Sequence, residues 1–262
     1  MPRKGAVKKA PGRAPDRPSG RMPKRAMVLA AGLGTRLRPL THKLPKALVQ
    51  VGGRTLLDRT IDRLEDAGVE RVVVNVHHLG HLIERHLGRR RSPEIRFSPE
   101  DELLGSGGGV ARALPLLGAD AFFVANADVL WLNGVGDALG RLAGTWDGGR
   151  MDGLLLIHFT VDAYGYDGMG DFCIDPQGVI TRRPEREVSP YMFTGVQILD
   201  GRLFKDRPDG PFSLNVLYDR AIAKGRLYGI VHDGEWFHVG TPEALALADA
   251  YVHARFAGNK RR

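Results

Sequence analysis

The stretch that decides the fold is residues 27–51, MVLAAGLGTRLRPLTHKLPKALVQV. Its first part, Met27 to Ala31, is a short apolar run typical of a buried strand. The glycines of Gly32-Leu33-Gly34 let backbone N–H groups approach an anion closely, and Arg36 and Lys46 add positive charge. The stretch therefore predicts a phosphate-binding loop at the end of a first strand.

Strands and helices alternate after this loop. Helices are predicted from Thr55 to Gly68 and over 79–87, and strands over 71–76 and 95–98. The order βαβαβ predicts a Rossmann-like, doubly wound α/β sheet with right-handed crossovers. Ligands in such sheets bind at the carboxyl ends of the strands, where the phosphate loop is expected.

The sequence pattern of the second half of the chain predicts that the sheet continues there within a single domain and becomes mixed. Turn residues between the expected strands are typical of hairpins and indicate antiparallel pairing. Strands are expected over 121–126, 153–160, 171–180, 191–199 and 226–231, and helices over 103–114, 133–144, 214–224 and from Thr241 onward.

The formal net charge of +8 belongs to the two ends of the chain. Residues 1–25 hold nine Lys/Arg and one acid with almost no large apolar side chain, so we expect a disordered, dispensable basic tail. A folded domain is expected over 26–257 and a flexible basic end over 258–262. The body, residues 26–259, has 26 Lys/Arg against 29 Asp/Glu, a net charge of −3. The basic composition therefore does not indicate a nucleic-acid-binding face.

Nothing in the composition indicates secretion or a membrane partner. No run of about 18 apolar residues occurs, and no charged-then-apolar leader opens the chain. Cys173 is the only cysteine, which rules out an internal disulfide. We therefore expect a cytoplasmic protein that works as a monomer or a small homo-oligomer.

Leu29 to Leu48 matches the pattern LxxGxGTRLxPLTxxxPKxL at every specified position. This pattern opens the sugar-1-phosphate nucleotidyltransferases, and the chain resembles that family over about residues 25–256. Two other phosphate loops do not fit, since the stretch contains neither GxGxxG nor GxxxxGK[ST]. The resemblance implies a glycosyltransferase-A-like domain. It also implies transfer of a nucleotidyl group from an NTP to a sugar 1-phosphate, with release of pyrophosphate and with Mg²⁺ as cofactor.

Asp128 is the candidate metal ligand. It follows a buried strand in Asn126-Ala127-Asp128, and Mg²⁺ takes one or two carboxylates together with phosphate oxygens and water. The family implies a second aspartate late in the chain, where this sequence has His238. Imidazole is a poor ligand for Mg²⁺. Two possibilities therefore stay open for the second side of the metal site. Either water and phosphates alone complete the ligands of the ion, or another carboxylate such as Asp233 or Glu235 takes the place of the aspartate.

The resemblance implies three catalytic residues. Arg36 and the nearby amides hold the leaving pyrophosphate, Lys46 lies between the α-phosphate and the acceptor phosphate, and Asp128 holds Mg²⁺. The implied nucleotide-binding residues are Ala30, Ala31, Gly32, Gly34, Thr35, Arg36, Lys46, Glu100 and Gly107. The glycines Gly107, Gly108 and Gly109 are expected to face the base, and a glycine-rich turn between strand and helix explains them equally well.

The sugar-phosphate side is implied by shorter matches. Arg183 aligns with a phosphate-gripping lysine of the family and Arg182 replaces a glutamate, and a solvated loop explains both equally well. Thr194 and Gly195 lie in the expected sugar-site strand, and Asp171 is a further candidate. The sugar-phosphate candidates are therefore Asp171, Arg183, Thr194 and Gly195.

The base and the sugar depend on three segments, 98–109, 170–172 and 193–195, which resemble the N-acetylmuramate-1-phosphate uridylyltransferases of the family. They imply UTP and N-acetylmuramate 1-phosphate as substrates, in the recycling of cell-wall sugars. A mannose- or heptose-1-phosphate guanylyltransferase is the alternative, since it shares the opening motif. A catalytically dead nucleotide-binding regulator is the alternative of another class, suggested by His238.

Overall fold

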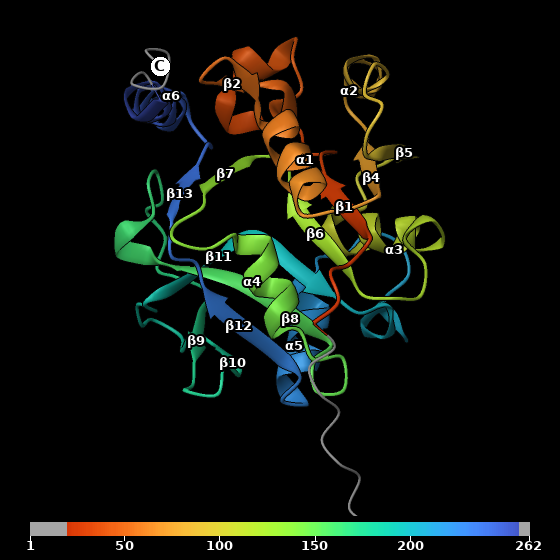
Figure 1. The fold of residues 1–262 in the computed structure, drawn as a ribbon, viewed down its shortest axis with the longest axis vertical. Coiled ribbons are helices and arrows are strands. Elements are labelled where there is room, and N and C mark those ends of the chain that lie inside the picture. Colours follow the sequence, from red (N-terminus) through yellow and green to blue (C-terminus); the bar gives the residue numbers. More distant parts are fainter. Residues whose placement is uncertain (1–19, 257–262) are drawn as a thin grey trace, which may run out of the picture.

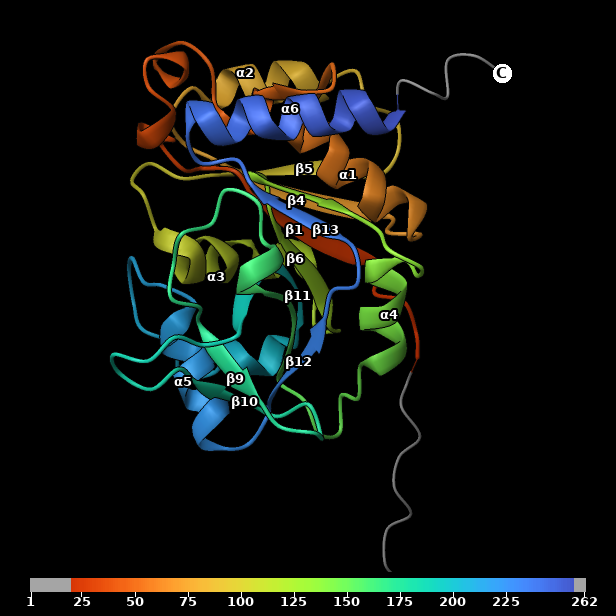
Figure 2. The same cartoon turned by 90° about the vertical axis from the view of Figure 1, so that its left-hand side faces the viewer.

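The computed structural model describes residues 20–256, and the expectations for 1–19 and 257–262 lie outside them. A nine-stranded sheet runs through the molecule, with helices on both faces (Figure 1 and Figure 2). Its parallel part has the order β5-β4-β1-β6, formed by β1 (Arg25–Leu29), β4 (Arg71–Val76), β5 (Glu94–Pro99) and β6 (Phe122–Asn126). Because β1 has β4 on one side and β6 on the other, the switch point of the sheet lies at its carboxyl end.

The rest of the sheet is mixed. β11 (Tyr191–Leu199) pairs antiparallel with β6 and with β8 (Gly153–Phe159), β12 (Leu227–Val231) lies parallel to β8, and β9 (Phe172–Ile174) and β10 (Ile180–Arg182) form an edge hairpin. Two small sheets pair β2 (Gln50–Val51) with β3 (Arg54–Thr55), and β7 (Val129–Leu132) with β13 (Glu235–His238). The expected doubly wound, mixed α/β sheet is thus confirmed.

Five α-helices of the described part cover both faces of the large sheet, and the last one packs against the two small sheets in a separate core. They are α1 (Leu56–Asp66), α2 (Gly80–Leu87), α3 (Gly105–Leu117), α4 (Ala138–Thr145), α5 (Asn215–Ala223) and α6 (Pro242–Phe256). One apolar core lies between the sheet and α1, α2 and α4, and a second lies between the sheet and α3 and α5. None of these helices is long and apolar enough to span a membrane.

Both faces of β1 are buried. Ala26 and Val28 pack in the core beneath α1 and α2, whereas Met27 packs in the core beneath α3. Successive side chains of a strand point to opposite faces, so a strand covered on both sides needs apolar residues at every position. This explains why the first strand reads as a continuous apolar run.

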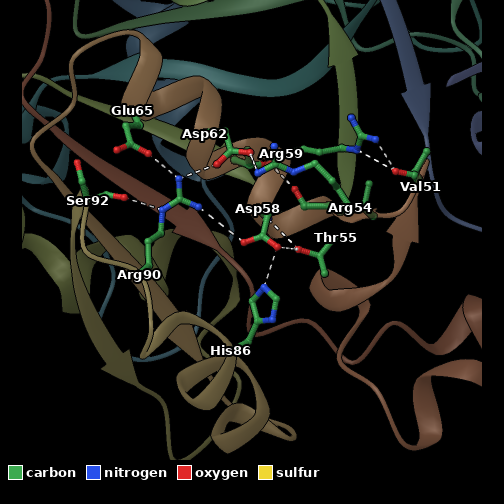
Figure 3. A network of polar contacts seen from close by, with 12 residues as sticks. Val51, Arg54, Thr55, Asp58, Arg59, Asp62, Glu65, His86, Arg90 and Ser92 are labelled. Carbon is green, nitrogen blue, oxygen red and sulfur yellow. Dashed lines mark hydrogen bonds and ion pairs between the residues drawn. The ribbon is translucent and has the colours of Figure 1, made fainter. Parts of the chain in front are cut away.

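A polar network ties α1 to the loop that follows α2 (Figure 3). Arg90 donates to Asp62 at 2.6 Å and to Glu65 at 2.7 Å. On the same helix, Arg59 donates to the carbonyl of Val51 in β2. The Arg59 contact holds α1 against the β2–β3 hairpin, which follows the glycine-rich loop.

The structure adds β7 and β13, which the sequence pattern does not predict, and it moves two other elements. The helix expected over 133–144 begins only at Ala138, because the Asp137 side chain accepts from a backbone N–H in the first turn and caps it there. The strand expected over 171–180 is instead β9 and the first residue of β10, joined by a turn in which Asp175 accepts two backbone N–H bonds.

Candidate active site

A cavity of about 400 Å³ opens at the carboxyl ends of β1 and β6, at the switch point of the sheet. The loop after β1 forms one side, and the end of β6 with the next two residues forms another. The predicted residues that line it are Ala30, Ala31, Gly32, Gly34, Thr35, Arg36, Lys46, Glu100 and Asp128. Of the nucleotide-binding and catalytic candidates, Gly107 alone is outside this lining.

Gly34 gives the phosphate loop its tight turn. Its φ of +61° lies in the left-handed region, and a side chain there would start 2.9 Å from the Cβ of Lys46. Thr41 donates to the Gly34 carbonyl at 2.8 Å and fixes the loop from the other side. The loop therefore packs directly against Lys46, while Arg36 stays exposed at the cavity.

Lys46 and Asp128 form an ion pair inside the cavity. The Lys46 Nζ lies 2.8 Å from Asp128 Oδ2, and the two side chains are 10% and 36% exposed. Lys46 begins a short 3-10 turn after Pro45, and Asp128 follows β6. The protein thus places one cation and one carboxylate between the phosphate loop and the switch point.

His238 lies beside this pair. It is the last residue of β13, where it pairs with Val129, the residue after Asp128. Its ring stacks on Trp236 with ring centroids 6.0 Å apart. Burial lowers the pKa of His238 and the charge of Lys46 lowers it further, against a smaller opposing effect of Asp128. We therefore expect a neutral imidazole at pH 7.

The two carboxylates considered as substitute ligands are engaged elsewhere. Asp233 pairs with Arg141 at 2.8 Å, and Glu235 accepts from Tyr251 at 2.8 Å and pairs with Arg255. Both line a separate cavity that does not include Asp128. Neither is placed as a substitute for the aspartate that the family pattern implies at position 238.

The turn into α3 explains its glycines by packing. Gly107 and Gly108 donate their N–H groups to the carbonyl of Phe212, and a side chain at Gly107 would start 2.3 Å from the Phe212 ring. Gly107 therefore lies beneath Phe212, whereas Gly105 and Ser106 line the cavity. Sequence reasoning did not single out these two as cavity residues, nor Asn75 and Asn126, which also line it.

The four sugar-phosphate candidates lie outside the lining of this cavity. Thr194 is fully buried and donates to the Leu156 carbonyl at 2.7 Å, and Asp171 accepts from the Phe193 N–H at 2.8 Å. Gly195 has a φ of +84°, and a side chain there would start 2.8 Å from Asn126 Nδ2.

The guanidinium of Arg183 donates hydrogen bonds to the backbone. It donates to the carbonyls of Gly170, Pro184 and Glu187 at 3.2, 3.1 and 2.7 Å. Arg182 pairs with Asp219 at 2.7 Å. Arg183 therefore holds the loop after β10 together, and Arg182 ties β10 to α5.

Two aromatic residues connect this region to the Lys46–Asp128 pair. Tyr166 accepts from the Gly170 N–H at 3.1 Å, and its ring meets that of Trp236 edge-on at 6.4 Å. Burial raises the pKa of Tyr166, and the charge of Asp171 raises it further. Trp236 in turn stacks on His238. Sequence reasoning missed Tyr166 and Trp236, because no local pattern marks them.

The fold and the site define a nucleotidyltransferase: a glycine-rich phosphate loop after the first strand faces a lysine–aspartate pair at the switch point of a mixed sheet. Residues 25–255 match the family model of nucleotidyl transferases. The chain belongs to the sugar-1-phosphate nucleotidyltransferase family, which confirms the resemblance seen in the sequence.

Relatives and solved structures agree with this membership. N-acetylmuramate alpha-1-phosphate uridylyltransferases of Caulobacter vibrioides and Neisseria meningitidis are 44% and 34% identical, each over 87% of this chain and over 96% and 99% of their own length. A mannose-1-phosphate guanylyltransferase catalytic subunit beta of Drosophila melanogaster is 28% identical over 84% of this chain and 60% of its own. HddC from Yersinia pseudotuberculosis, solved with GMP-PN, has the same fold, with a TM-score of 0.71 and 24% identity over 87% of this chain and 99% of its own.

Proposed function

We propose that the protein joins UTP to N-acetylmuramate α-1-phosphate and releases pyrophosphate, giving a UDP-sugar for the recycling of cell-wall sugars. The reaction type rests on the Lys46–Asp128 pair, which lies inside the cavity next to the phosphate loop. The choice of substrates is supported by the 44% and 34% identity to uridylyltransferases that act on this sugar phosphate, against 28% for a guanylyltransferase.

The chemistry needs placement and charge more than proton transfer. An oxygen of the sugar phosphate attacks the α-phosphorus of the nucleotide in line, a new P–O bond forms, and the α–β P–O bond breaks so that pyrophosphate leaves. The attacking oxygen is already anionic, so no general base is required. Arg36 and the loop amides hold the leaving pyrophosphate. Lys46 gives up part of its contact with Asp128 and instead contacts the α-phosphate of the nucleotide and the phosphate of the sugar.

The donors at Asp128 fit a magnesium ion that arrives with the nucleotide. Asp128 and Glu100 are the two carboxylates of the cavity, and both oxygens of Glu100 already accept hydrogen bonds. Asp128 therefore supplies one oxygen ligand, and phosphates and water supply the rest. Within residues 20–256, no three His, Cys, Asp or Glu side chains are placed to hold a metal ion by themselves. When bound, Mg²⁺ neutralises phosphate charge.

The acceptor sugar is proposed to lie between Asn126 and the loop that carries Tyr166 and Asp171. Asn126 faces the nucleotide cavity, and Gly195 lets it approach β11 closely. A nucleotide-consuming enzyme of this kind suits the cytoplasm, where nucleoside triphosphates are made.

Pyrophosphate release, measured with each of the four NTPs and a panel of sugar 1-phosphates, tests the proposal. We expect the highest kcat/KM for UTP with N-acetylmuramate α-1-phosphate. A preference for GTP with mannose 1-phosphate or a heptose 1-phosphate would establish the guanylyltransferase alternative instead. Nucleotide binding without turnover of any pair would favour the regulator.

A further inference from the structure

Asn75 and Glu100 are buried polar side chains between the two loops that border the cavity. Asn75 is 3% exposed near the carboxyl end of β4, and Glu100 is 5% exposed directly after β5. β4 and β5 are parallel neighbours, so both residues lie at the same edge of the sheet. A buried carboxylate needs hydrogen-bond partners, because an unpaired one is costly.

A continuous hydrogen-bond chain joins the backbone of Ala30 to that of Leu104 through these two side chains. The Ala30 N–H donates to Asn75 Oδ1 at 2.8 Å. Asn75 Nδ2 donates to Glu100 Oε1 at 2.7 Å, and the Leu104 N–H donates to Glu100 Oε2 at 3.1 Å. Ala30 begins the phosphate loop, and Leu104 precedes the turn at Gly105 and Ser106 that also lines the cavity.

The two ends of this hydrogen-bond chain determine which side chains can form it. Both ends are backbone N–H donors, so the two side chains together must offer three acceptor atoms and one donor. An amide with an ionised carboxylate meets that requirement. Two amides offer too few acceptors, and two ionised carboxylates offer no donor. If the amide and the carboxylate swap positions, so that an aspartate is at position 75 and a glutamine at position 100, the pair again offers three acceptor atoms and one donor.

Neighbouring groups fix the pair in place. The Glu100 N–H donates to the Val76 carbonyl, and the His77 side chain donates through Nδ1 to the Glu100 carbonyl, both at 2.9 Å, so the backbone of Glu100 is held on both sides. A side chain at Gly109 would start 2.8 Å from Glu100 Oε1 and 2.9 Å from Asn75 Nδ2. Glycine at that position lets α3 close over the pair, which accounts for one member of the glycine run 107–109.

We propose that Asn75 and Glu100 are positioning residues that set the spacing between the phosphate loop and the 103–106 turn. They act on the nucleotide through Ala30 and Leu104 and not on the reacting atoms. The inference rests on the proposed function in one respect, that the cavity holds the nucleotide. Glu100, expected from the resemblance to contact the nucleotide, here has both carboxylate oxygens engaged by the protein.

The test is an exchange of the two side-chain types. Asn75→Asp and Glu100→Gln are made singly and together, and KM for UTP, KM for the sugar phosphate and the melting temperature are measured. Each single change should raise KM for UTP by about 10-fold or more, because a buried partner is lost, with the other KM changed by less than about 2-fold. The double exchange should bring KM for UTP back to within about 3-fold of wild type.

A pH profile and a control separate positioning from general damage. Activity of the Asn75→Asp variant should recover in part as pH falls, because one proton shared by two carboxylates restores the missing donor. Gln197→Glu is the control, since Gln197 is a buried amide that bonds Tyr218 at 2.8 Å outside the cavity. It should lower the melting temperature and leave KM for UTP unchanged.

Two outcomes would overturn the inference. One is a double exchange no better than the worse single variant. The other is a set of single variants that lose thermal stability while both KM values stay at the wild-type level. Calorimetric binding of UTP to the wild-type protein separates the two proposals. A protein that binds UTP but turns over no sugar phosphate counts against the proposed function alone.

Discussion

Lys46 Nζ lies 2.8 Å from Asp128 Oδ2, and the two residues are 82 positions apart in the chain. Lys46 belongs to the segment after the phosphate loop, and Asp128 follows the strand on the far side of the switch point. The ion pair therefore joins the two sides of the cavity. It also holds the Lys46 ammonium and the Asp128 carboxylate in place before a substrate binds. The ammonium is thereby positioned for a phosphate and the carboxylate for a metal ion.

Removing either member of this pair should abolish catalysis while the fold persists. Lys46→Gln and Asp128→Asn are each expected to lower kcat/KM for pyrophosphate release by about 10²-fold or more, as loss of one charge-stabilising group does. Lys46 is buried and Asp128 is 36% exposed, so removing one partner should cost about 1 to 3 kcal/mol of unfolding free energy, which leaves the protein folded. Lys43→Gln, at an exposed lysine three residues before Lys46, is the matched control. Near-wild-type pyrophosphate release by either variant contradicts the assignment of that residue.

Restoring a carboxylate at position 238 should change the demand for magnesium. His238→Asp places a second hard oxygen donor next to Asp128, and Mg²⁺ prefers such donors. The Mg²⁺ concentration for half-maximal activity is expected to fall by about tenfold, equivalent to one further favourable ligand contact. His238→Asn is the control, because it removes the imidazole without adding a charge. An unchanged magnesium titration would show that position 238 does not approach the ion.

Two histidines with lowered pKa values, the buried His232 and the half-buried His238, should make stability depend on pH. The pKa of His238 is lowered by burial and by Lys46, and that of His232 is lowered by burial and by His158. Below about pH 6.5 the unfolded chain takes up protons that the native protein does not, so stability is lost as pH falls from that value toward the lowered pKa values. Above about pH 6.5 both states are neutral at these sites and the effect is absent.

Denaturant unfolding between pH 5 and pH 8, a range of about three units around the free histidine pKa, checks this. His238→Gln should flatten the dependence, and His81→Gln, on the exposed side of α2, should leave it unchanged. A wild-type stability that rises as pH falls through the range would be the wrong sign.

The parts of the site that sequence reasoning could reach are those built from neighbouring residues. The glycines, Arg36 and Lys46 occupy one segment, so residue types and spacing predict the loop before any fold is known. Asp128 is predictable because it ends an apolar run. Asn75 carries a weaker signal of the same kind: a polar residue inside an otherwise apolar strand, close to its carboxyl end.

What sequence reasoning could not reach depends on pairing across the chain. The β7–β13 pairing places His238 beside Asp128, and the two strands are far apart in the chain, as the register of His238 with Val129 shows. Trp236 donates to the Thr194 carbonyl at 2.9 Å, so Thr194 is buried beneath an aromatic residue that no local pattern links to it. The engagement of Glu100 by Asn75 and Leu104 likewise needs the parallel register of β4 and β5.

Arg183 should support the sugar side by holding its loop. Its guanidinium donates to three backbone carbonyls between residues 170 and 187. Arg183→Ala is expected to raise KM for the sugar phosphate by about 10-fold, leave KM for UTP unchanged, and expose the 184–190 segment to limited proteolysis. Arg186→Asn removes an exposed arginine from the same loop and tolerates its positive φ of 63°, so it should change none of the three. Unchanged proteolysis with a raised KM would indicate direct phosphate contact instead.

Gly195 is expected to control the acceptor side through Asn126. Alanine at a φ of +84° is strained by about 1 kcal/mol, and its Cβ would start 2.8 Å from Asn126 Nδ2 and 3.1 Å from Asn126 Cβ. The side chain of Asn126 must therefore move within the cavity that it lines. Gly210→Ala isolates the two effects, since Gly210 has a φ of +71° and a Cβ added there would meet nothing within 4 Å. Gly195→Ala should lose more stability than Gly210→Ala in denaturant unfolding, because the contact with Asn126 adds to the backbone strain, and only Gly195→Ala should lower kcat/KM for the sugar phosphate. If the two variants had the same kcat/KM for the sugar phosphate, Asn126 would have no part in binding this substrate.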